Sequence, residues 1–560
     1  RLRQNMQGCI LTIEQIERGA SLPSDLNPEG YQNLIELFDR CVEQYSPRPA
    51  VTSLGCTLSF ADLDRYSRAF ATYLLEEAKL QPGDRVALQL PNLIQYPVLV
   101  FGALRAGIIL VNTNPLYTPE EMARQFKDSG AKLLVIYAGM AHKLEQVLDQ
   151  TDIERVLVTQ VGDFGPRLRG AFLNFAVRWI KRAEPKFNLP RVAWLKPTLD
   201  AWVGRDARYP DLALGDVAVL QYTGGTTGVA KGAVLTHANL LANILQGRAV
   251  MSVMPNGWVE QVISPLPLYH IYAFVVSQII AAEGGHSLLI PNPRDLDGFV
   301  KTLKSTRMSC FIGLNTLFVA LCRHPQFAKV DVSNLKATVS GGMALTSAAA
   351  DAWRKATGQE IIEAYGLTEA SPAVTANDPL NPQIGSIGKP LPSTQVDIRE
   401  QGYRSLGTNE PGELCVKGPQ VMRCYWNRPE ETAATFTADG WLRTGDIATI
   451  DQDGLIHIVD RAKDLIIVSG FNVYPNEVEE VVASHPDVVE CAVIGEANEE
   501  SGEQVHLFVV SANPELTERE LVEHCRANLA PYKCPKRVSF RDELPKTPVG
   551  KVLRRALREE

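Results

Sequence analysis

Apolar and polar positions along the chain alternate between helical and strand-like spacing. Residues 61–77 have helical spacing, and the apolar run 85–90 that follows predicts a strand. A second helix is predicted over residues 95–106 and a second strand over residues 108–112. Alternation of strands and helices in this order indicates an α/β fold with a doubly wound, mostly parallel sheet.

The next helix has both of its ends marked in the sequence. Thr118 is a typical N-cap, Pro119 suits the first helical position, and two acids follow before the pattern stops at Gly130. The same rhythm returns in four segments further along, at residues 261–264, 271–282, 286–290 and 308–312. A second subdomain with similar winding is therefore expected.

From about residue 381 the pattern changes to short strands separated by Gly and Pro, including 396–399 and 412–418. This pattern of short strands predicts a third subdomain, which would be a small β-barrel or a distorted sheet. The charged run DRAKD at 460–464 precedes a smaller α+β pattern. We expect an N-terminal domain over residues 1–460, a hinge at 461–464 and a mobile C-terminal domain over 465–560.

Composition narrows the class of protein. The chain has 560 residues, is 45% hydrophobic and carries a net charge of -8, so binding to nucleic acid is not expected. Its ten cysteines form no C-x-x-C pair, which argues against a disulfide framework or a zinc site. No export signal is visible, and a cytoplasmic location is expected. The uncharged stretch 262–282 contains Pro265 and Pro267, so we interpret it as a strand, turn and helix.

The stretch QYTGGTTGVAKG at residues 221–232 has the composition of a phosphate-binding loop. Glycines allow backbone N–H groups to turn inward, threonines add hydroxyl donors, and Lys231 adds a positive charge. These residues are Thr223, Gly224, Gly225, Thr226, Thr227, Gly228 and Lys231. The P-loop of nucleoside triphosphatases is excluded, because the glycine spacing is shorter and Gly232 stands where that loop has Ser or Thr.

Six further motifs accompany this loop: PLPLYH at 265–270, SGGM at 340–343, EAYGLTE at 363–369, WLRTGD at 441–446, DRAKDLIIVSGFNVYPNEVE at 460–479 and PKTPVGK at 545–551. From about Leu26 onward, the chain resembles the adenylate-forming enzymes, and most closely the bacterial long-chain fatty-acyl-CoA ligases. The resemblance implies that ATP and a medium- or long-chain fatty acid form an acyl-adenylate, and that coenzyme A then displaces AMP.

The resemblance also assigns the nucleotide site. Thr223 and Glu369 resemble the Mg²⁺ contacts, Tyr365 would stack on adenine, and Thr368 would bind the α-phosphate. Asp446 and Arg461 would hold the ribose. The remaining ATP- or AMP-binding positions are the loop residues 223–228 with Lys231, and Gly341, Gly342, Glu363, Ala364, Gly366 and Lys463.

The same family assigns three further roles. Lys551 would be the catalytic lysine of adenylate formation, assisted by Thr223 and Glu369, and Lys463 would lie at the hinge. Gly470 would leave room for the pantetheine arm of coenzyme A. His270 and Phe274 resemble the positions at the entrance and gate of the acyl tunnel, where some relatives have tryptophan in place of Phe274.

Two alternatives stay open on the sequence alone. One is a fatty-acyl-AMP ligase that loads a carrier protein; the uninterrupted segment 464–479 disfavours it. The other is a non-catalytic lipid-binding relative, disfavoured because Lys231, Glu369, Asp446 and Lys551 are all present. The preferred chain length and the oligomeric state are also open, with a homodimer as one expectation because dimers are common in the family.

Residues 162–186 depart from the strand and helix rhythm. Six basic residues lie among large apolar ones, and no acid occurs between Asp163 and Glu184. The basic residues are Arg167, Arg169, Arg178, Lys181, Arg182 and Lys186. One interpretation is an insertion helix packed on its own domain. The other is a peripheral helix that contacts the anionic inner face of the membrane.

Overall fold

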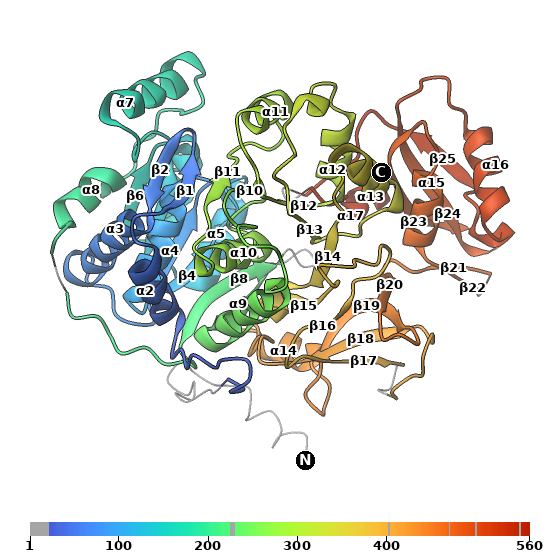
Figure 1. Ribbon diagram of the computed structural model, residues 1–560, viewed down its shortest axis with the longest axis horizontal. Helices are drawn as coiled ribbons and strands as arrows, with labels where there is room; N and C mark the ends of the chain where they lie inside the picture. The colour runs from blue at the N-terminus through green and yellow to red at the C-terminus, as the bar shows by residue number, and fades with distance from the viewer. Residues whose placement is uncertain are drawn as a thin grey trace.

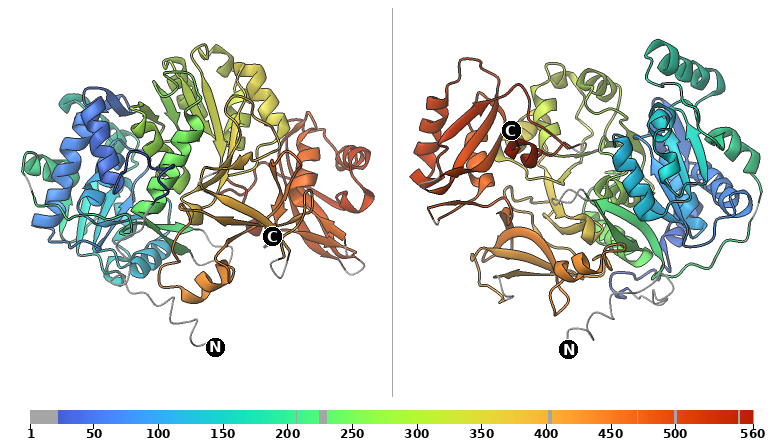
Figure 2. Two further views of the ribbon diagram at one scale, coloured as in Figure 1. Left: turned by 60° about the horizontal axis from the view of Figure 1, so that its bottom comes forward. Right: turned by 180° about the vertical axis from the view of Figure 1, so that it is seen from behind.

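The computed structural model of the protein describes residues 22–205, 207–223, 230–400, 404–469, 471–498, 501–547 and 550–559. Two α/β subdomains lie side by side, with a smaller β subdomain below them and the C-terminal segment at one end (Figure 1). Views from below and from behind show the same four parts (Figure 2).

The first subdomain contains a seven-stranded sheet in the order β7-β6-β5-β3-β4-β8-β9. All of its strand pairs are parallel except β8 with β9. The strands are β3 (Arg85–Gln89), β4 (Ile109–Asn112), β5 (Leu133–Tyr137), β6 (Arg155–Thr159), β7 (Val192–Trp194), β8 (Val217–Thr223) and β9 (Lys231–Thr236). The expected doubly wound sheet is confirmed, but β9 was not predicted.

The helices of this half follow the predicted pattern. They are α2 (Leu34–Tyr45), α3 (Phe60–Thr72) with the π-helix η3 (Tyr73–Glu77), α4 (Gln95–Arg105), α5 (Pro119–Ser129), α6 (Ala141–Leu144) and α8 (Leu195–Trp202), with short 3₁₀ turns η4 (Ala138–Met140) and η5 (Leu148–Gln150). Helix α5 has the predicted ends, because Thr118 and Glu121 form a reciprocal capping box and Gly130 adopts a left-handed conformation (φ 61°).

The second subdomain is built on a nine-stranded sheet in the order β16-β15-β14-β13-β12-β10-β11-β1-β2. Its centre is parallel and its edges are antiparallel. The strands are β1 (Pro49–Ser53), β2 (Cys56–Ser59), β10 (Val262–Ser264), β11 (Ser287–Leu289), β12 (Cys310–Gly313), β13 (Ala337–Gly341), β14 (Ile362–Gly366), β15 (Ala373–Ala376) and β16 (Lys389–Pro390). The helices are α9 (His237–Met251), α10 (Ile271–Ala282), α11 (Leu296–Lys304), α12 (Asn315–Arg323) and α13 (Ser347–Thr357), with 3₁₀ turns η7 (Phe327–Lys329) and η8 (Thr368–Ala370).

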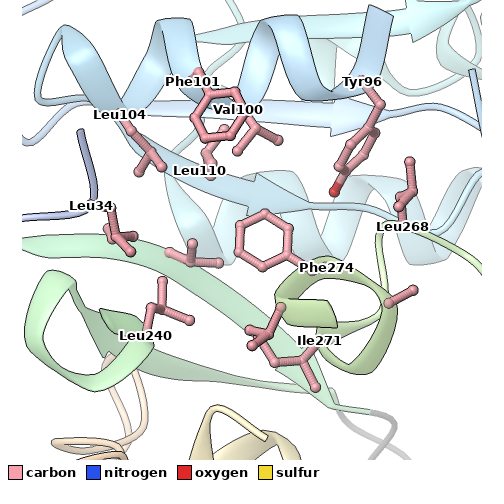
Figure 3. Packing of buried hydrophobic residues seen from close by; sticks show 14 of the residues in the cluster. Leu34, Tyr96, Val100, Phe101, Leu104, Leu110, Leu240, Leu268, Ile271 and Phe274 are labelled. Carbon is pink, nitrogen blue, oxygen red and sulfur yellow. The ribbon is translucent and has the colours of Figure 1, made fainter. Parts of the chain in front are cut away.

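Helices α2, α4, α9 and α10 pack between the two large sheets and share one hydrophobic core with both of them. Figure 3 shows Phe274 of α10 inside this core, facing Leu110 of β4 and the side chains of α4. Phe274 is 1% exposed. The predicted strand, turn and helix over 262–282 are confirmed as β10, a turn and α10.

The third subdomain is an antiparallel sheet in the order β17-β18-β19-β20. Its strands are β17 (Gln395–Arg399), β18 (Gly412–Lys417), β19 (Leu442–Ile450) and β20 (Ile456–Arg461), and α14 (Pro429–Thr435) lies between β18 and β19 in the chain. Within the described residues, β17 does not pair with β20. Of the two forms predicted for this subdomain, the structure therefore shows the sheet, which is open, and the closed β-barrel is wrong.

The C-terminal segment forms its own sheet, β22-β21-β24-β23, with β25 paired to β24. The strands are β21 (Ile466–Val468), β22 (Phe471–Val473), β23 (Val488–Asn498), β24 (Gly502–Ser511) and β25 (Arg537–Phe540); the helices are α15 (Pro475–Ala483), α16 (Glu518–Asn528) and α17 (Arg554–Arg558), with the 3₁₀ turn η9 (Pro531–Lys533). It has a separate hydrophobic core. This is the small α+β unit that the sequence predicts.

The segment 162–186 contains α7 (Arg167–Phe175), which continues into the π-helix η6 (Ala176–Ile180). This helix stands away from the body of the protein at the outer end of the first subdomain (Figure 1). None of the helices in the described ranges has both the length and the apolar character that crossing a membrane requires.

Candidate active site

One cavity of about 440 Å³ lies between the large subdomains and the C-terminal segment. Its wall includes the carboxyl ends of β13 and β14, the ends of β8 and β9 that face each other, Arg461 at the end of β20, and Lys551. Ligands of open α/β sheets bind outside the carboxyl ends of the strands. The cavity is therefore where the fold places a ligand.

Asp446, Arg461 and Tyr365 form one polar group at the cavity. Strands β19 and β20 pair Asp446 with Arg461, and the Arg461 Nε lies 2.9 Å from the Asp446 Oδ1. The Tyr365 hydroxyl donates a hydrogen bond of 2.5 Å to the Asp446 Oδ2. Burial raises the pKa of Tyr365 well above its ordinary value, so this hydroxyl stays a donor. Tyr365 and Arg461, from two other motifs, thus meet around the buried carboxylate of Asp446.

A second polar group lies where β8 and β9 meet the cavity. Thr223 ends β8, and Lys231, which begins β9, has its ammonium 5.3 Å from the ring centre of Tyr425. The Tyr425 hydroxyl donates a 2.5 Å hydrogen bond to the Glu369 Oε1. All four residues line the cavity. Together, these four side chains place one positive charge and several oxygen atoms at the same end of the cavity.

Small residues allow close approach to the backbone between these groups. Gly341, Gly342, Ala364, Gly366 and Thr368 all line the cavity. Gly342 has φ +84°, which side-chain-bearing residues rarely adopt, and a Cβ on Gly366 would lie 2.1 Å from the Pro372 carbonyl oxygen. A substitution at either position would displace the backbone that borders the cavity.

Lys551 reaches the same cavity from the C-terminal segment. Burial, reinforced by the positive charge of Arg461, lowers the pKa of Lys551 to about 8, although Asp446 acts in the opposite direction. Burial and the charge of Lys551 lower the pKa of His270 to about 3, so His270 is neutral at physiological pH. The cavity therefore holds a buried ammonium with a perturbed pKa, which is typical of functional sites.

The other end of the cavity is apolar. It follows α9 and α10, and its wall there is formed by Gly247, Val250, Met251, Trp258, Val275, Val276, Ile279 and Ile280. Ile312, Val339 and Ile362 of the central sheet form its floor. A ligand that fills the whole cavity therefore has a polar or charged end and a hydrophobic end.

The structure does not bring every expected residue to this cavity. Glu363 is buried and does not line the cavity. It accepts a 3.4 Å hydrogen bond from the Leu345 backbone N–H, and burial raises its pKa to about 8. Phe274 lies in the core on the opposite face of α10 from the cavity lining. Lys463 is exposed in the turn after β20 and does not line the cavity. Gly224, Gly225, Thr226, Thr227, Gly228 and Gly470 lie outside the described residues.

Several cavity residues were not anticipated from the sequence. Tyr425 carries no motif of its own, and it reaches Glu369 through a backbone bridge between its segment and Ala233 of β9. Tyr272 and Asn243 also line the cavity. Gly247 also lines the cavity, and its position inside α9 costs the helix about 1 kcal/mol relative to alanine.

Two family models match this chain. The model described as AMP-binding enzyme covers residues 38–426, and the model described as AMP-binding enzyme C-terminal domain covers residues 477–551. The chain is 49% identical to a protein of Yersinia pestis named long-chain-fatty-acid--CoA ligase, over 97% of this chain and 96% of that protein. It is 35% identical to a Bacillus subtilis protein of the same name, over 97% of both.

Solved structures agree in fold. The ATP-bound MatB from Rhodopseudomonas palustris is 29% identical, with a TM-score of 0.81 over 94% of this chain and 98% of that one. The anthranilate CoA ligase AuaEII with anthranoyl-AMP has a TM-score of 0.85 over 98% of both chains, and at 22% identity it supports the fold alone. With the family models matching most of its length, the chain belongs to the AMP-binding, adenylate-forming enzymes, as its motifs predicted.

Proposed function

We propose that this protein is an ATP-dependent, AMP-forming ligase that joins a medium- or long-chain fatty acid to coenzyme A. The acid and ATP form an acyl-adenylate with release of pyrophosphate, and the thiol of coenzyme A then displaces AMP. Seven bacterial relatives bear the name long-chain-fatty-acid--CoA ligase, which supports this proposal; six of them are 46% to 49% identical to this chain, and the seventh is 35% identical.

The observation that carries the proposal is the continuity of the cavity. Its charged end holds Lys231, Glu369, Arg461 and Lys551, and its other end lies between the apolar faces of α9 and α10. A nucleotide suits the first end and an alkyl chain suits the second. The carboxylate of a fatty acid that occupies the apolar end would therefore lie near the nucleotide, which is the arrangement that adenylation requires.

The residues at the charged end have roles that fit this reaction. Lys551 would stabilise the negative charge that develops between the carboxylate and the α-phosphate, and Thr368 would donate to that phosphate. Asp446 would accept the ribose hydroxyls, while Arg461 and Tyr365 hold its carboxylate in place. Tyr365 would also offer its ring to adenine. Lys231 would neutralise charge on the outer phosphates.

Mg²⁺ fits the donor atoms at this end. Thr223 and Glu369 offer a hydroxyl and a carboxylate on the same cavity, and hard cations prefer such oxygen ligands. No group of three His, Cys, Asp or Glu residues within the described ranges could hold a metal ion by itself. This agrees with Mg²⁺ bound mainly by phosphate oxygens and water, where it would neutralise phosphate charge.

The decisive experiment measures pyrophosphate and AMP release with acids from acetate to oleate, each with and without coenzyme A. The proposed ligase releases AMP only when coenzyme A is present, and it prefers the longer acids. A fatty-acyl-AMP ligase would release pyrophosphate but show no response to coenzyme A. A non-catalytic relative would release neither product, and either result would overturn the proposal.

We also propose that α7 and η6 attach the protein peripherally to an anionic membrane. Large apolar side chains at positions 168, 172, 175 and 179 recur at intervals of four, three and four residues, so they form one stripe along the helix. The exposed fractions are 87% for Leu168, 67% for Phe172, 55% for Phe175 and 58% for Trp179. This interfacial stripe, defined by these four residues, faces solvent.

The charges around the interfacial stripe favour a lipid surface. Arg167, Arg178, Lys181, Arg182 and Lys186 are all exposed, and no acid lies between Asp163 and Glu184. Arg169, the sixth basic residue, instead bonds within the protein. It donates hydrogen bonds to the Gly55 carbonyl at 3.0 Å and to the Leu54 carbonyl at 3.4 Å. Those bonds fasten one face of the helix to the turn between β1 and β2, so the apolar stripe stays on the outer face.

Sedimentation with vesicles tests this attachment. Replacing Arg178, Lys181 and Arg182 with glutamine should reduce binding to vesicles of phosphatidylcholine and phosphatidylglycerol, most clearly at low salt, because each basic residue near the surface contributes about 1 kcal/mol. A matched control replaces Lys301, Lys329 and Lys355, which are exposed on the other subdomain, with glutamine. Equal losses in the two variants, or no binding by the unmodified protein, would contradict the proposal.

A further inference from the structure

The apolar half of the cavity has a defined direction. Helix α10 begins at the carboxyl edge of the nine-stranded sheet, near the nucleotide end, and finishes at the amino edge. At that far edge, Ile280 lies beside Gly285 and Val259, the neighbour of the cavity residue Trp258. Depth in the cavity therefore increases along α10 from Tyr272 to Ile280.

Helix α9 runs in the same direction along the other wall. Asn243 lies at the shallow end, because its side chain donates to the Ala373 carbonyl at 2.8 Å and accepts from the Ala373 N–H at 3.0 Å. Ala373 is paired with Gly366, which borders the nucleotide end. Val250 and Met251, two turns further along α9, line the deep end together with Trp258.

Gly247 of α9 and Ile279 of α10 lie against each other where they line the cavity. A Cβ placed on Gly247 would lie 2.4 Å from the Ile279 Cδ1 and 3.4 Å from its Cγ1. Among the residues that the structure describes, no other heavy atom outside α9 would lie within 4 Å of that Cβ. A side chain at position 247 would therefore turn the Ile279 side chain into the cavity or occupy that space itself.

We infer that Gly247, acting with Ile279, determines the length of acyl chain that this enzyme accepts. Ile279 is seven residues beyond Tyr272 on α10. At a rise of 1.5 Å per residue, the Gly247–Ile279 contact therefore lies about 10 Å deeper along the helix than Tyr272. A short acyl chain ends before this contact. A long chain must pass it to reach the section bounded by Val250, Met251 and Trp258, and the missing side chain of Gly247 leaves that passage open.

The inference rests on the proposed fatty-acid activity and names the part of the cavity that selects among acids. Selection by one methyl group is physically reasonable, because a single methylene changes discrimination in an apolar pocket by roughly 10- to 200-fold. The glycine also has a cost for the helix, since alanine is favoured over glycine inside helices. The space that Gly247 leaves in the cavity is the gain that offsets this cost.

The test compares kcat/KM for hexanoate and palmitate in Gly247→Ala and Gly247→Val. We expect activity with palmitate to fall about tenfold or more while activity with hexanoate changes less than about twofold. A second substitution that restores activity with palmitate provides the sharper measurement. Ile279→Val deletes the δ-methyl group that a Cβ at position 247 would meet, so the double variant Gly247→Ala/Ile279→Val should regain activity with palmitate.

Ala249→Val is the matched control, because it enlarges an exposed residue of the same helix that does not line the cavity. Its ratio of palmitate to hexanoate activity should equal that of the unmodified enzyme. Equal losses with both acids in the Gly247 variants, or no recovery in the double variant, would overturn the inference. An unmodified enzyme that activates neither acid would overturn the proposed function instead, and the two failures are thereby distinguished.

Discussion

At the scale of single residues, the chemistry depends on charges that the fold brings together from distant motifs. Lys551 follows Arg461 by ninety positions in the chain, yet the two positive groups border one cavity and the charge of Arg461 contributes to the lowered pKa of Lys551. Asp446 partly offsets that repulsion. A phosphate or carboxylate entering the cavity would supply the negative charge that this arrangement lacks.

Replacement of Lys551 by alanine should lower the rate of adenylate formation by about 10²- to 10³-fold, the usual loss when a preorganised charge contact is removed. Thioester formation from a supplied acyl-adenylate should be largely unchanged, because Lys551 would serve only the first half-reaction. Both rates are measured by rapid quench with the same acid. Comparable losses in the two half-reactions would remove Lys551 from the proposed role.

The pH dependence gives an independent check on the same residue. Because burial lowers the pKa of Lys551 to about 8, its ammonium is present below that pH and is lost above it. The kcat/KM for adenylation, which reports the free enzyme, should therefore decline above about pH 8. This decline should disappear in the Lys551→Ala variant.

At the scale of secondary-structure elements, sequence signals were reliable where they are local. Helix α5 could be placed because Thr118, Pro119 and Gly130 act within one turn of its ends. Strand β9 was missed because its register depends on pairing with β8 across the intervening loop. Whether β17 to β20 close into a barrel or stay open depends likewise on distant pairing, and the sequence indicated only short strands.

Side-chain direction was less predictable than element type. Helix α10 is apolar on nearly all sides, so the spacing of its residues does not say which face borders the cavity. The structure directs Val276 and Ile279 to the cavity and Phe274 to the core. Most of the polar site was predictable, since Asp446, Arg461, Tyr365, Glu369 and Lys551 come from distinctive motifs. Tyr425 was not, because only the folded chain brings it to Glu369.

The turn after β20 is the element on which domain motion would depend. Asp460 accepts a 2.8 Å hydrogen bond from the Asn476 N–H, and Asp464 pairs with Arg558 at 2.9 Å and with Arg554 at 3.4 Å. The carboxylates on both sides of the turn are thus fixed to the C-terminal segment. Lys463 between them is exposed.

Lys463→Pro should leave adenylation measurable and stall thioester synthesis, because proline fixes φ at the proposed hinge. The backbone hydrogen bonds of this turn are donated by Ala462, to Gly445, and by Asp464, to Arg461, so proline at 463 removes neither donor. Lys463→Ala controls for loss of the charge. Normal overall turnover in the proline variant would exclude Lys463 as the pivot.

At the scale of the whole molecule, two hydrogen bonds outside the cavity join the second subdomain to the C-terminal segment, which carries Lys551. Arg323 at the end of α12 donates a 2.6 Å hydrogen bond to the Val488 carbonyl of β23. The Ser347 N–H at the start of α13 donates to the Glu480 Oε1 of α15 at 3.1 Å. Both link the second subdomain to the C-terminal segment, and neither touches the cavity.

Removing both contacts, in Arg323→Ala/Glu480→Ala, should lower the adenylation rate by up to about thirtyfold, since each hydrogen bond contributes about 1 kcal/mol and both support the same orientation. Thioester formation from supplied acyl-adenylate should be unchanged or faster, because that step would need the segment to leave this position. The control is Arg519→Ala/Glu523→Ala, which removes an exposed 2.8 Å ion pair within α16 and leaves both linking contacts in place. If the two double variants lose adenylation equally, or if the first slows both half-reactions alike, these contacts do not hold the adenylating orientation.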